Sequence, residues 1–222
     1  MHAVGIVAAA GSGLRLGAEV PKALVPLGGR PLVCWAVESL RAGGVVDVVV
    51  AVPEAERDAF AAVLPADVQL VPGGATRTDS VRKALAAAPV RARAVLVHDA
   101  ARPLTPPAVV ARVLAALAGG ARAVVPVLPV VDTTVVVTED GLVSSDVARA
   151  PLRRVQTPQG FDRTALEAGY HRLEQLGSGF TDDATLVMSS GVAVHTVAGD
   201  ELSAKVTVPH DLRLAELLAS GR

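Results

Sequence analysis

A glycine-rich segment with two nearby cations is the first feature of the sequence that could carry chemistry. Residues 8–13 read Ala-Ala-Ala-Gly-Ser-Gly, directly after an apolar run, and Arg15 and Lys22 follow. A glycine turn at a strand end lets backbone N–H groups approach a phosphate chain. The dinucleotide fingerprint would need a glycine at Leu16, and the Gly-Lys-Ser/Thr of a P-loop is missing. The cations indicate a triphosphate site, although an ordinary strand–helix connection with solvated charges would look similar.

A second glycine pair follows a later apolar run. Gly73 and Gly74 allow close backbone approach at the end of a strand, where open α/β sheets bind their ligands. Arg77 and Ser80 come next and could reach a nucleobase or a phosphate. The segment also leads into a helix that Thr78 would cap, and a cap and a binding loop are compatible.

A carboxylate ends the next apolar run. Asp99 follows residues 94–98, and from there it could hold a divalent cation, since Mg²⁺ typically takes one or two carboxylates together with substrate phosphates. The alternative interpretation is a helix cap or a salt bridge with Arg102. His98 is expected to be a core or orienting histidine, and we assign it no catalytic role.

Hydroxyls and cations in the second half form a weaker set. They would make a second anion site if the fold gathers them, whereas scattered surface polarity is the default interpretation. The set comprises Asp132-Thr133, Arg149, Thr157-Pro158-Gln159, Thr181-Asp182-Asp183 and Lys205. Paired catalytic carboxylates, a Ser-His-Asp arrangement and zinc-ligand spacing are missing from the sequence.

The elements that must position these residues are short, Val-rich apolar runs that alternate with helical segments. The runs are 4–10, 45–52, 68–71, 94–98 and 123–127, and the helical segments are 31–42, 54–64, 78–88 and 106–117. Apolar runs without alternation indicate strands buried on both faces, as in a parallel sheet crossed by helices. The sequence therefore predicts a doubly wound α/β fold.

After Pro129 the pattern changes to a hairpin. Residues 133–137 and 142–147 are extended segments joined by Thr-Glu-Asp-Gly, and Asp-Gly is a strong hairpin signal. Because an isolated hairpin is marginal in water, we expect an arm at about 133–150 that packs against a partner subunit; a hairpin folded onto its own domain is the alternative. Helices at 163–175, 182–190 and 209–218 and a strand at 192–197 complete one domain, residues 1–222.

Composition excludes several classes of protein. The 222 residues include 21 Lys+Arg against 22 Asp+Glu and only 2% aromatics, which argues against a nucleic-acid binder. The single cysteine, Cys34, excludes a disulfide framework. Apolar runs fall short of the roughly 20 residues that span a bilayer, and no signal peptide is evident. We expect a cytoplasmic protein without membrane contact.

Taken in order, the motifs resemble those of the 2-C-methyl-D-erythritol 4-phosphate cytidylyltransferase family. The likeness runs from Ala8 to about Leu214 and is carried by residues 8–17, 21–22, 73–81, 98–103, 132–133, 157–159, 181–184 and 205–207. The resemblance implies a Rossmann-like fold of the nucleotide-diphospho-sugar transferase type and a homodimer that exchanges its arms. It also implies transfer of CMP from CTP to methylerythritol phosphate, with Mg²⁺ as cofactor and pyrophosphate as product.

The resemblance further implies roles for individual residues. Arg15 and Lys22 would stabilise the transition state, and Asp99 would help to place Mg²⁺. Nucleotide contacts are implied for Ala8, Ala9, Ala10, Gly11, Ser12, Gly13, Gly74, Arg77, Ser80 and Ala100. Acceptor contacts are implied for Thr133, Arg149, Thr157, Thr181, Lys205 and Arg102, of which Thr133 and Arg149 would act on the neighbouring subunit's site.

The chemistry of the residues agrees with this reaction. A phosphate monoester is largely dianionic near neutral pH, so the acceptor needs no general base.

Ala75 stands where some members of the family carry an acidic residue, and the length suggests a monofunctional enzyme. A ribitol-5-phosphate cytidylyltransferase, or less closely a CMP-sugar synthetase, and a non-catalytic nucleotide-sensing dimer stay open as alternatives.

Overall fold

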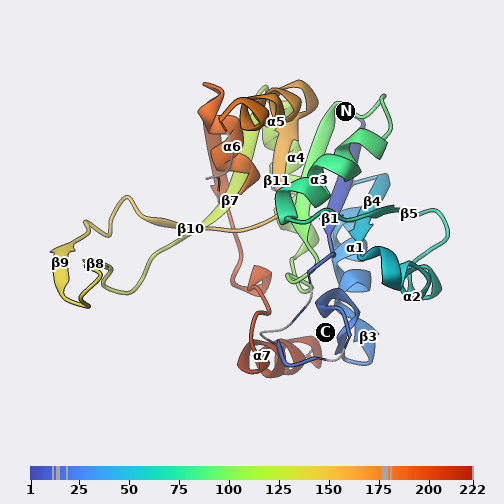
Figure 1. Cartoon of the computed structure of the whole chain (residues 1–222), viewed down its shortest axis with the longest axis horizontal. Coiled ribbons are helices and arrows are strands. Elements are labelled where there is room, and N and C mark those ends of the chain that lie inside the picture. Colours follow the sequence, from blue (N-terminus) through green and yellow to red (C-terminus); the bar gives the residue numbers. More distant parts are fainter. Residues whose placement is uncertain (12, 14–15, 19, 177–179, 181, 222) are drawn as a thin grey trace.

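The computed structural model describes residues 1–11, 13, 16–18, 20–176, 180 and 182–221, and in them a central sheet of eight strands carries the fold (Figure 1). The strands are β1 (Ala3–Ala8), β4 (Asp47–Val52), β5 (Gln69–Pro72), β6 (Ala94–Asp99), β7 (Ala123–Pro129), β10 (Arg153–Val155), β11 (Gln159–Asp162) and β12 (Val194–Ala198). Their order is β10-β7-β11-β6-β1-β4-β5, and β12 also pairs with β7.

Parallel pairing brings the ends of four strands to one edge of the sheet. β1 is parallel to β4 and to β6, with Ala8 opposite both Ala51 and Asp99, and β5 is parallel to β4. The segments that follow these strands therefore start side by side. β11 runs antiparallel between β6 and β7, so the residues that precede it reach the same edge.

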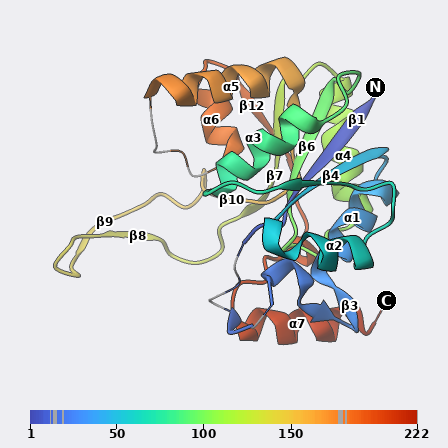
Figure 2. The ribbon, with the colours of Figure 1, turned by 45° about the vertical axis from the view of Figure 1, so that its right-hand side comes forward.

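Helices cover both faces of the sheet, as the alternation of apolar runs and helical segments predicts (Figure 2). One face carries α1 (Leu32–Ala42), α2 (Arg57–Val63), preceded by the turn η3 (Glu54–Glu56), and α4 (Pro107–Ala118); the other carries α3 (Arg77–Ala87), α5 (Arg163–Leu176) and α6 (Asp183–Ser189). Val37, Phe60 and Val113 belong to the first apolar layer, and Val81 and Leu166 to the second. The predicted doubly wound α/β fold is confirmed.

A third apolar cluster joins the C-terminal helix to the segment that carries Lys22. Its elements are η2 (Lys22–Leu24), β2 (Pro26–Leu27), β3 (Arg30–Pro31), η4 (Glu201–Ser203) and α7 (Pro209–Ala219). Leu27, Leu32 and Ala215 are buried in it. Trp35 packs against it, and the indole N–H donates to the Leu27 carbonyl at 3.1 Å. We call residues 22–35 together with α7 the Trp35 lobe.

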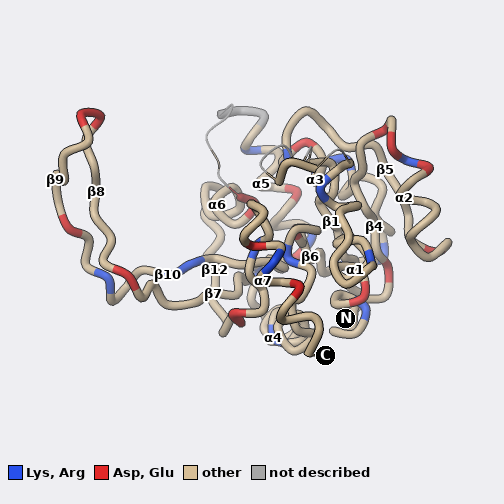
Figure 3. The backbone as a smooth tube through the Cα atoms, turned by 90° about the horizontal axis from the view of Figure 1, so that it is seen from below, with Lys and Arg blue, Asp and Glu red and all other residues tan. Residues whose placement is uncertain are grey.

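The predicted hairpin is an arm that extends away from the sheet (Figures 1 and 3). It consists of β8 (Val135–Val137) and β9 (Val143–Asp146), and Figure 3 shows acidic residues at its tip. Val136 is 49% exposed and Val143 65% exposed. The arm thus offers apolar side chains to solvent instead of folding onto its own sheet.

The N-cap of α3 differs from the one predicted. Thr76, not Thr78, caps α3: its Oγ1 accepts a hydrogen bond from the Asp79 N–H at 3.0 Å. The helix consequently begins at Arg77, whose side chain leaves from its first turn.

Among the helices in the described ranges, none combines the length and the apolar character needed to cross a bilayer.

Gly160 on β11 provides a test of how tightly the sheet meets its helical layer. A Cβ there would lie 2.3 Å from Val113 Cγ1 and 3.0 Å from Leu117 Cδ1. Because overpacking forces side chains and backbone to shift, Gly160→Ala should lower the free energy of unfolding by about 1–3 kcal/mol, measured by urea denaturation. Gly119→Ala, whose Cβ would meet nothing closer than 3.4 Å, should cost less than about 0.5 kcal/mol. Equal losses in both variants would contradict this account.

Candidate active site

A cavity of about 620 Å³ opens at the edge where the parallel strands end. The segments after β1, β5 and β6 line it, and so do Lys205 and Thr207 ahead of α7. Residues singled out from the sequence that line it are Ala8, Ala9, Ala10, Gly11, Gly13, Lys22, Gly74, Arg77, Ser80, Asp99, Ala100 and Lys205. Ser12, Arg15 and Thr181 lie outside the described residues.

Asp99 is a buried residue of the cavity floor and is paired with two cations. Its Oδ1 accepts a hydrogen bond from Arg77 Nε at 3.0 Å, and its Oδ2 accepts one from Lys205 Nζ at 2.8 Å. Burial acts to raise the pKa of Asp99, but the charges and hydrogen bonds of Arg77 and Lys205 outweigh it and hold that pKa far below its usual range. Asp99 is therefore ionised. The alternative pairing with Arg102 is wrong, since Arg102 donates to the Ser203 carbonyl at 2.7 Å.

The far side of Arg77 is held by a second carboxylate. Its Nη1 donates to Asp183 Oδ2 at 2.6 Å, and the Tyr170 hydroxyl donates to Asp183 Oδ1 at 2.7 Å. Asp183 is 1% exposed. Asp183 belongs to the Thr-Asp-Asp segment singled out from the sequence, but no role was predicted for it. Tyr170, the only tyrosine of the chain, was not predicted as a site residue.

Thr157 and His98 support Asp99 from inside the fold. Thr157 Oγ1 accepts a hydrogen bond from the Asp99 N–H at 3.1 Å and lies 2.9 Å from His98 Nδ1. Thr157 is buried and is not among the residues that line the cavity. His98 is fully buried, as expected of a core histidine, and desolvation lowers its pKa to about 4.

Glycines let the first two loops approach each other and the cavity. A Cβ on Gly73 would lie 2.5 Å from the Cβ of Ala10, so the two loops touch at this point. The Gly74 N–H donates to Ser80 Oγ at 2.9 Å, and that hydroxyl donates to the Thr76 carbonyl. Ser80 thus holds the turn that carries Gly74, rather than pointing a free hydroxyl at a ligand.

Lys22 is brought to the cavity wall by the return of its own loop. Gly13 has a φ of +73°, in the left-handed region that favours glycine, and a Cβ there would lie 3.0 Å from the Lys22 backbone nitrogen. The Lys22 N–H donates to the Gly11 carbonyl at 3.4 Å. The glycine segment therefore both lines the cavity and fixes the position of Lys22.

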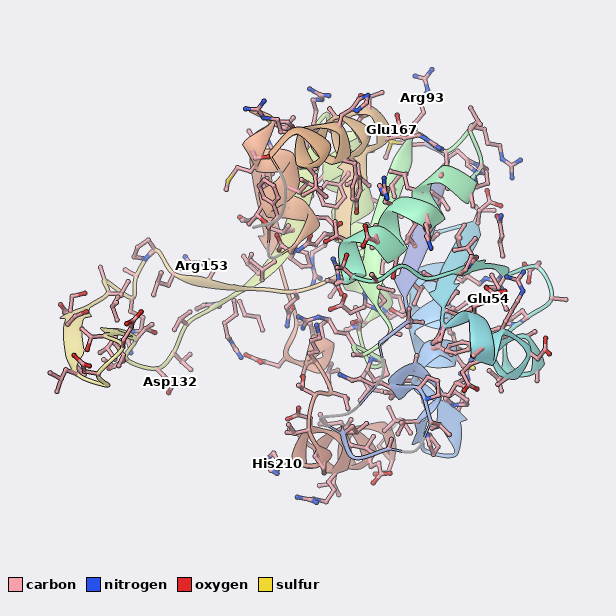
Figure 4. All side chains as sticks on the ribbon, viewed as in Figure 1. Glu54, Arg93, Asp132, Arg153, Glu167 and His210 are labelled. Atoms are coloured by element: carbon pink, nitrogen blue, oxygen red, sulfur yellow. The ribbon has the colours of Figure 1, made fainter. Side chains whose placement is uncertain are left out.

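Thr133 and Arg149 lie at the arm, away from the cavity of their own chain. Figure 4 labels Asp132 and Arg153, which mark the two ends of the arm. The Arg149 guanidinium donates to the Val131 carbonyl at 2.6 Å, and both Thr133 and Arg149 are exposed. In the isolated chain the structure does not bring them together with Lys22 and Asp99.

The donor set at Asp99 fits a divalent cation that shares its ligands with a nucleotide. Within residues 1–11, 13, 16–18, 20–176, 180 and 182–221, no three His, Cys, Asp or Glu side chains gather to form a metal cage. Mg²⁺ commonly uses one or two carboxylates and takes its other ligands from phosphates and water. Each carboxylate oxygen has two lone pairs, so Asp99 keeps acceptor capacity beside its two cations.

Comparisons with known proteins point in one direction. Residues 3–220 match the family described as 2-C-methyl-D-erythritol 4-phosphate cytidylyltransferase. A protein of that name from Nocardia farcinica is 53% identical over 222 residues, covering 99% of this chain and 94% of its own length. One from Saccharopolyspora erythraea is 51% identical, covering 97% of this chain and 98% of its own length. The crystal structure of the Thermus thermophilus protein of that name superposes with a TM-score of 0.83 at 38% identity, covering 99% of this chain and 100% of that one.

The buried His98 makes stability depend on pH. Its pKa is about 4 in the folded chain and about 6.5 when unfolded, so between these values only the unfolded state binds the proton. Stability should therefore be fully present above about pH 6.5 and fall by up to about 3 kcal/mol as the pH drops to 4. Chemical denaturation at several pH values measures this, with His98→Asn as the non-titrating control. Equal slopes for both proteins would contradict the prediction.

Proposed function

The chain belongs to the 2-C-methyl-D-erythritol 4-phosphate cytidylyltransferase family, and we propose that the cavity at the sheet edge is its active site. The enzyme transfers CMP from CTP to 2-C-methyl-D-erythritol 4-phosphate, giving CDP-methylerythritol and pyrophosphate for isoprenoid precursor synthesis. The observation that carries the site assignment is that one cavity gathers the glycine segment, Lys22, Asp99 and Lys205.

The nucleotide lies along the first two loops in this proposal. Backbone N–H groups of residues 8–13 cradle the phosphates, because glycines allow the backbone to approach them closely. The turn at Gly74 receives the base and ribose, and Arg77 and Ser80 hold that turn and the floor beneath it. Ala100, which also lines the cavity, contributes to the same nucleotide-binding site.

Cations lower the barrier to the in-line attack of the acceptor phosphate on the α-phosphorus of CTP. The attack brings a dianion to a phosphate whose oxygens already carry negative charge, and preorganised positive groups stabilise the charge on these oxygens. Lys22 does this from the cavity wall, and Arg15, by the family resemblance, does it from the same loop. Lys205 offers an ammonium to the acceptor phosphate, with Thr181 and Arg102 as further acceptor contacts, while Thr157 supports Asp99 from behind.

The proposed cofactor is a divalent cation, Mg²⁺ in the first instance. Asp99 would hold it together with the nucleotide phosphates. When bound, the ion screens the triphosphate from the incoming dianion and makes pyrophosphate a better leaving group. Asp99 stays ionised for this task because Arg77 and Lys205 keep its pKa low.

We also propose that the enzyme is a homodimer joined through its arms. The exposed valines of β8 and β9 support this, because such a surface is stable when a partner covers it. Thr133 and Arg149 would then reach the acceptor end of the neighbouring subunit's cavity. A single domain over residues 1–222 and a cytoplasmic location remain part of the proposal.

Pyrophosphate release tests the reaction and the acceptor together. With CTP and Mg²⁺ we expect release with 2-C-methyl-D-erythritol 4-phosphate and none above background with ribitol 5-phosphate. Release only with ribitol 5-phosphate would keep the mechanism but change the acceptor. Binding of CTP without release from either acceptor would favour the non-catalytic alternative.

Lys22→Ala tests the proposed role at the transition state. Loss of a preorganised cation from a phosphoryl-transfer site should reduce kcat by about 10²–10³-fold or more without changing the thermal unfolding temperature. Lys83→Ala serves as the control, because Lys83 is exposed and donates to the Gly73 carbonyl outside the cavity lining. A folded Lys22→Ala enzyme with near-normal turnover would remove Lys22 from the mechanism.

Mixing two inactive variants tests the exchange of arms. If Arg149 serves the neighbouring cavity, a dimer of one Lys22→Ala and one Arg149→Ala subunit has one intact site and one site with both changes. After equal amounts are unfolded and refolded together, random pairing should restore about a quarter of wild-type activity. No recovery in a mixture that forms dimers would mean that each arm serves its own subunit.

A further inference from the structure

A row of four charged side chains runs from the protein interior to the cavity. Asp183 pairs with Arg77, Arg77 pairs with Asp99, and Asp99 pairs with Lys205, at 2.6, 3.0 and 2.8 Å. Two negative and two positive groups make the row electrically neutral. Asp183 does not line the cavity, and the family resemblance implies no role for it.

The charges of Arg77 and Lys205 alone would exceed the charge of Asp99. Without Asp183, one carboxylate would face two cations, and the floor of the cavity would carry a net positive charge. In a buried site such a charge acts strongly on neighbouring ions, because the effective dielectric constant is far below that of water. A divalent cation would meet repulsion at the very carboxylate that the proposed function assigns to it.

The geometry of Arg77 divides its guanidinium between the two carboxylates. Nη1 faces Asp183, which is 1% exposed, and Nε faces Asp99. The Tyr170 hydroxyl donates to the other oxygen of Asp183 and so fixes the orientation of this carboxylate. Three helices, α3, α5 and α6, thus contribute to one buried contact.

We propose that Asp183 is a positioning residue that neutralises Arg77, so that the surroundings of Asp99 do not repel the divalent cation that Asp99 holds in the nucleotide complex. The inference rests on the proposed role of Asp99. Asp183 acts through Arg77 and touches neither substrate nor metal. Tyr170 orients Asp183 without adding charge. Variants of Asp183 and of Tyr170 can therefore separate the effect of the carboxylate's charge from the effect of its orientation.

The test measures the affinity for Mn²⁺, a paramagnetic substitute for Mg²⁺, by water proton relaxation in the presence of CTP and without acceptor. Asp183→Asn keeps the shape and removes the charge, and we expect Mn²⁺ to bind about tenfold or more weakly. Asp183→Glu and Tyr170→Phe keep the charge and should stay within about threefold of the wild type. Asp67→Asn, an exposed carboxylate paired with Arg41, controls for net charge and should change nothing.

A second readout separates charge from loss of fold. Metal-free CTP should bind to Asp183→Asn at least as tightly as to the wild type. Without the Asp183 carboxylate, the positive charge of Arg77 is no longer fully compensated and attracts phosphate. A damaged fold would weaken both ligands. The double variant with Arg77→Gln and Asp183→Asn is neutral again and should recover Mn²⁺ affinity to within about threefold of the wild type.

Three results would overturn the proposal. They are wild-type Mn²⁺ affinity in Asp183→Asn, equal losses in Asp183→Asn, Asp183→Glu and Tyr170→Phe, and a double variant that stays tenfold weak. Failure of the proposed function itself would show elsewhere. Unchanged Mn²⁺ affinity in Asp99→Asn would remove the cation from Asp99, and absence of pyrophosphate release in the wild type would reject the reaction.

Discussion

The ionised carboxylate of Asp99 is the feature on which the other parts of the site depend. It ends β6 and receives Arg77 from α3 and Lys205 from the segment ahead of α7. Its backbone is held by Thr157, which precedes β11. Taking a carboxylate out of water costs several kcal/mol unless charges and hydrogen bonds compensate. Four segments that are far apart in the chain must therefore meet at one place before the cavity can hold the ionised carboxylate of Asp99.

The sheet supplies that meeting place through its strand directions. Parallel β1, β5 and β6 deliver the two glycine loops and Asp99 to one edge. The antiparallel β11 delivers its preceding residues to the same edge, so Thr157 arrives from the opposite chain direction. The usual rule that ligands meet the residues after strands thus holds for most of this site, while the support beneath Asp99 comes from a residue before a strand.

Much of the fold and part of the site could be predicted from the sequence. Continuous apolar runs predicted strands β1, β4, β5, β6 and β7 and their buried faces, and Asp-Gly predicted the arm. β10 and β11 were missed because their residues do not form such runs: in β11, Gln159 is buried but finds partners in Asp182 and the Ala184 N–H, and Gly160 makes room for α4. The partners of Asp99 were out of reach for a related reason. The sequence offered Arg102, three residues away, whereas the folded chain selects Arg77 and Lys205, which are 22 and 106 residues away.

The Trp35 lobe gives the enzyme an optical property of its own. Trp35 is the only tryptophan of the chain, its ring lies under the Arg30 guanidinium at 5.3 Å, and its N–H is tied to the Leu27 carbonyl. The same lobe begins at Lys22, on the wall of the cavity. When the indole alone is excited, intrinsic fluorescence therefore arises from a single, defined environment that adjoins the loop carrying Lys22, and the rest of the chain does not contribute.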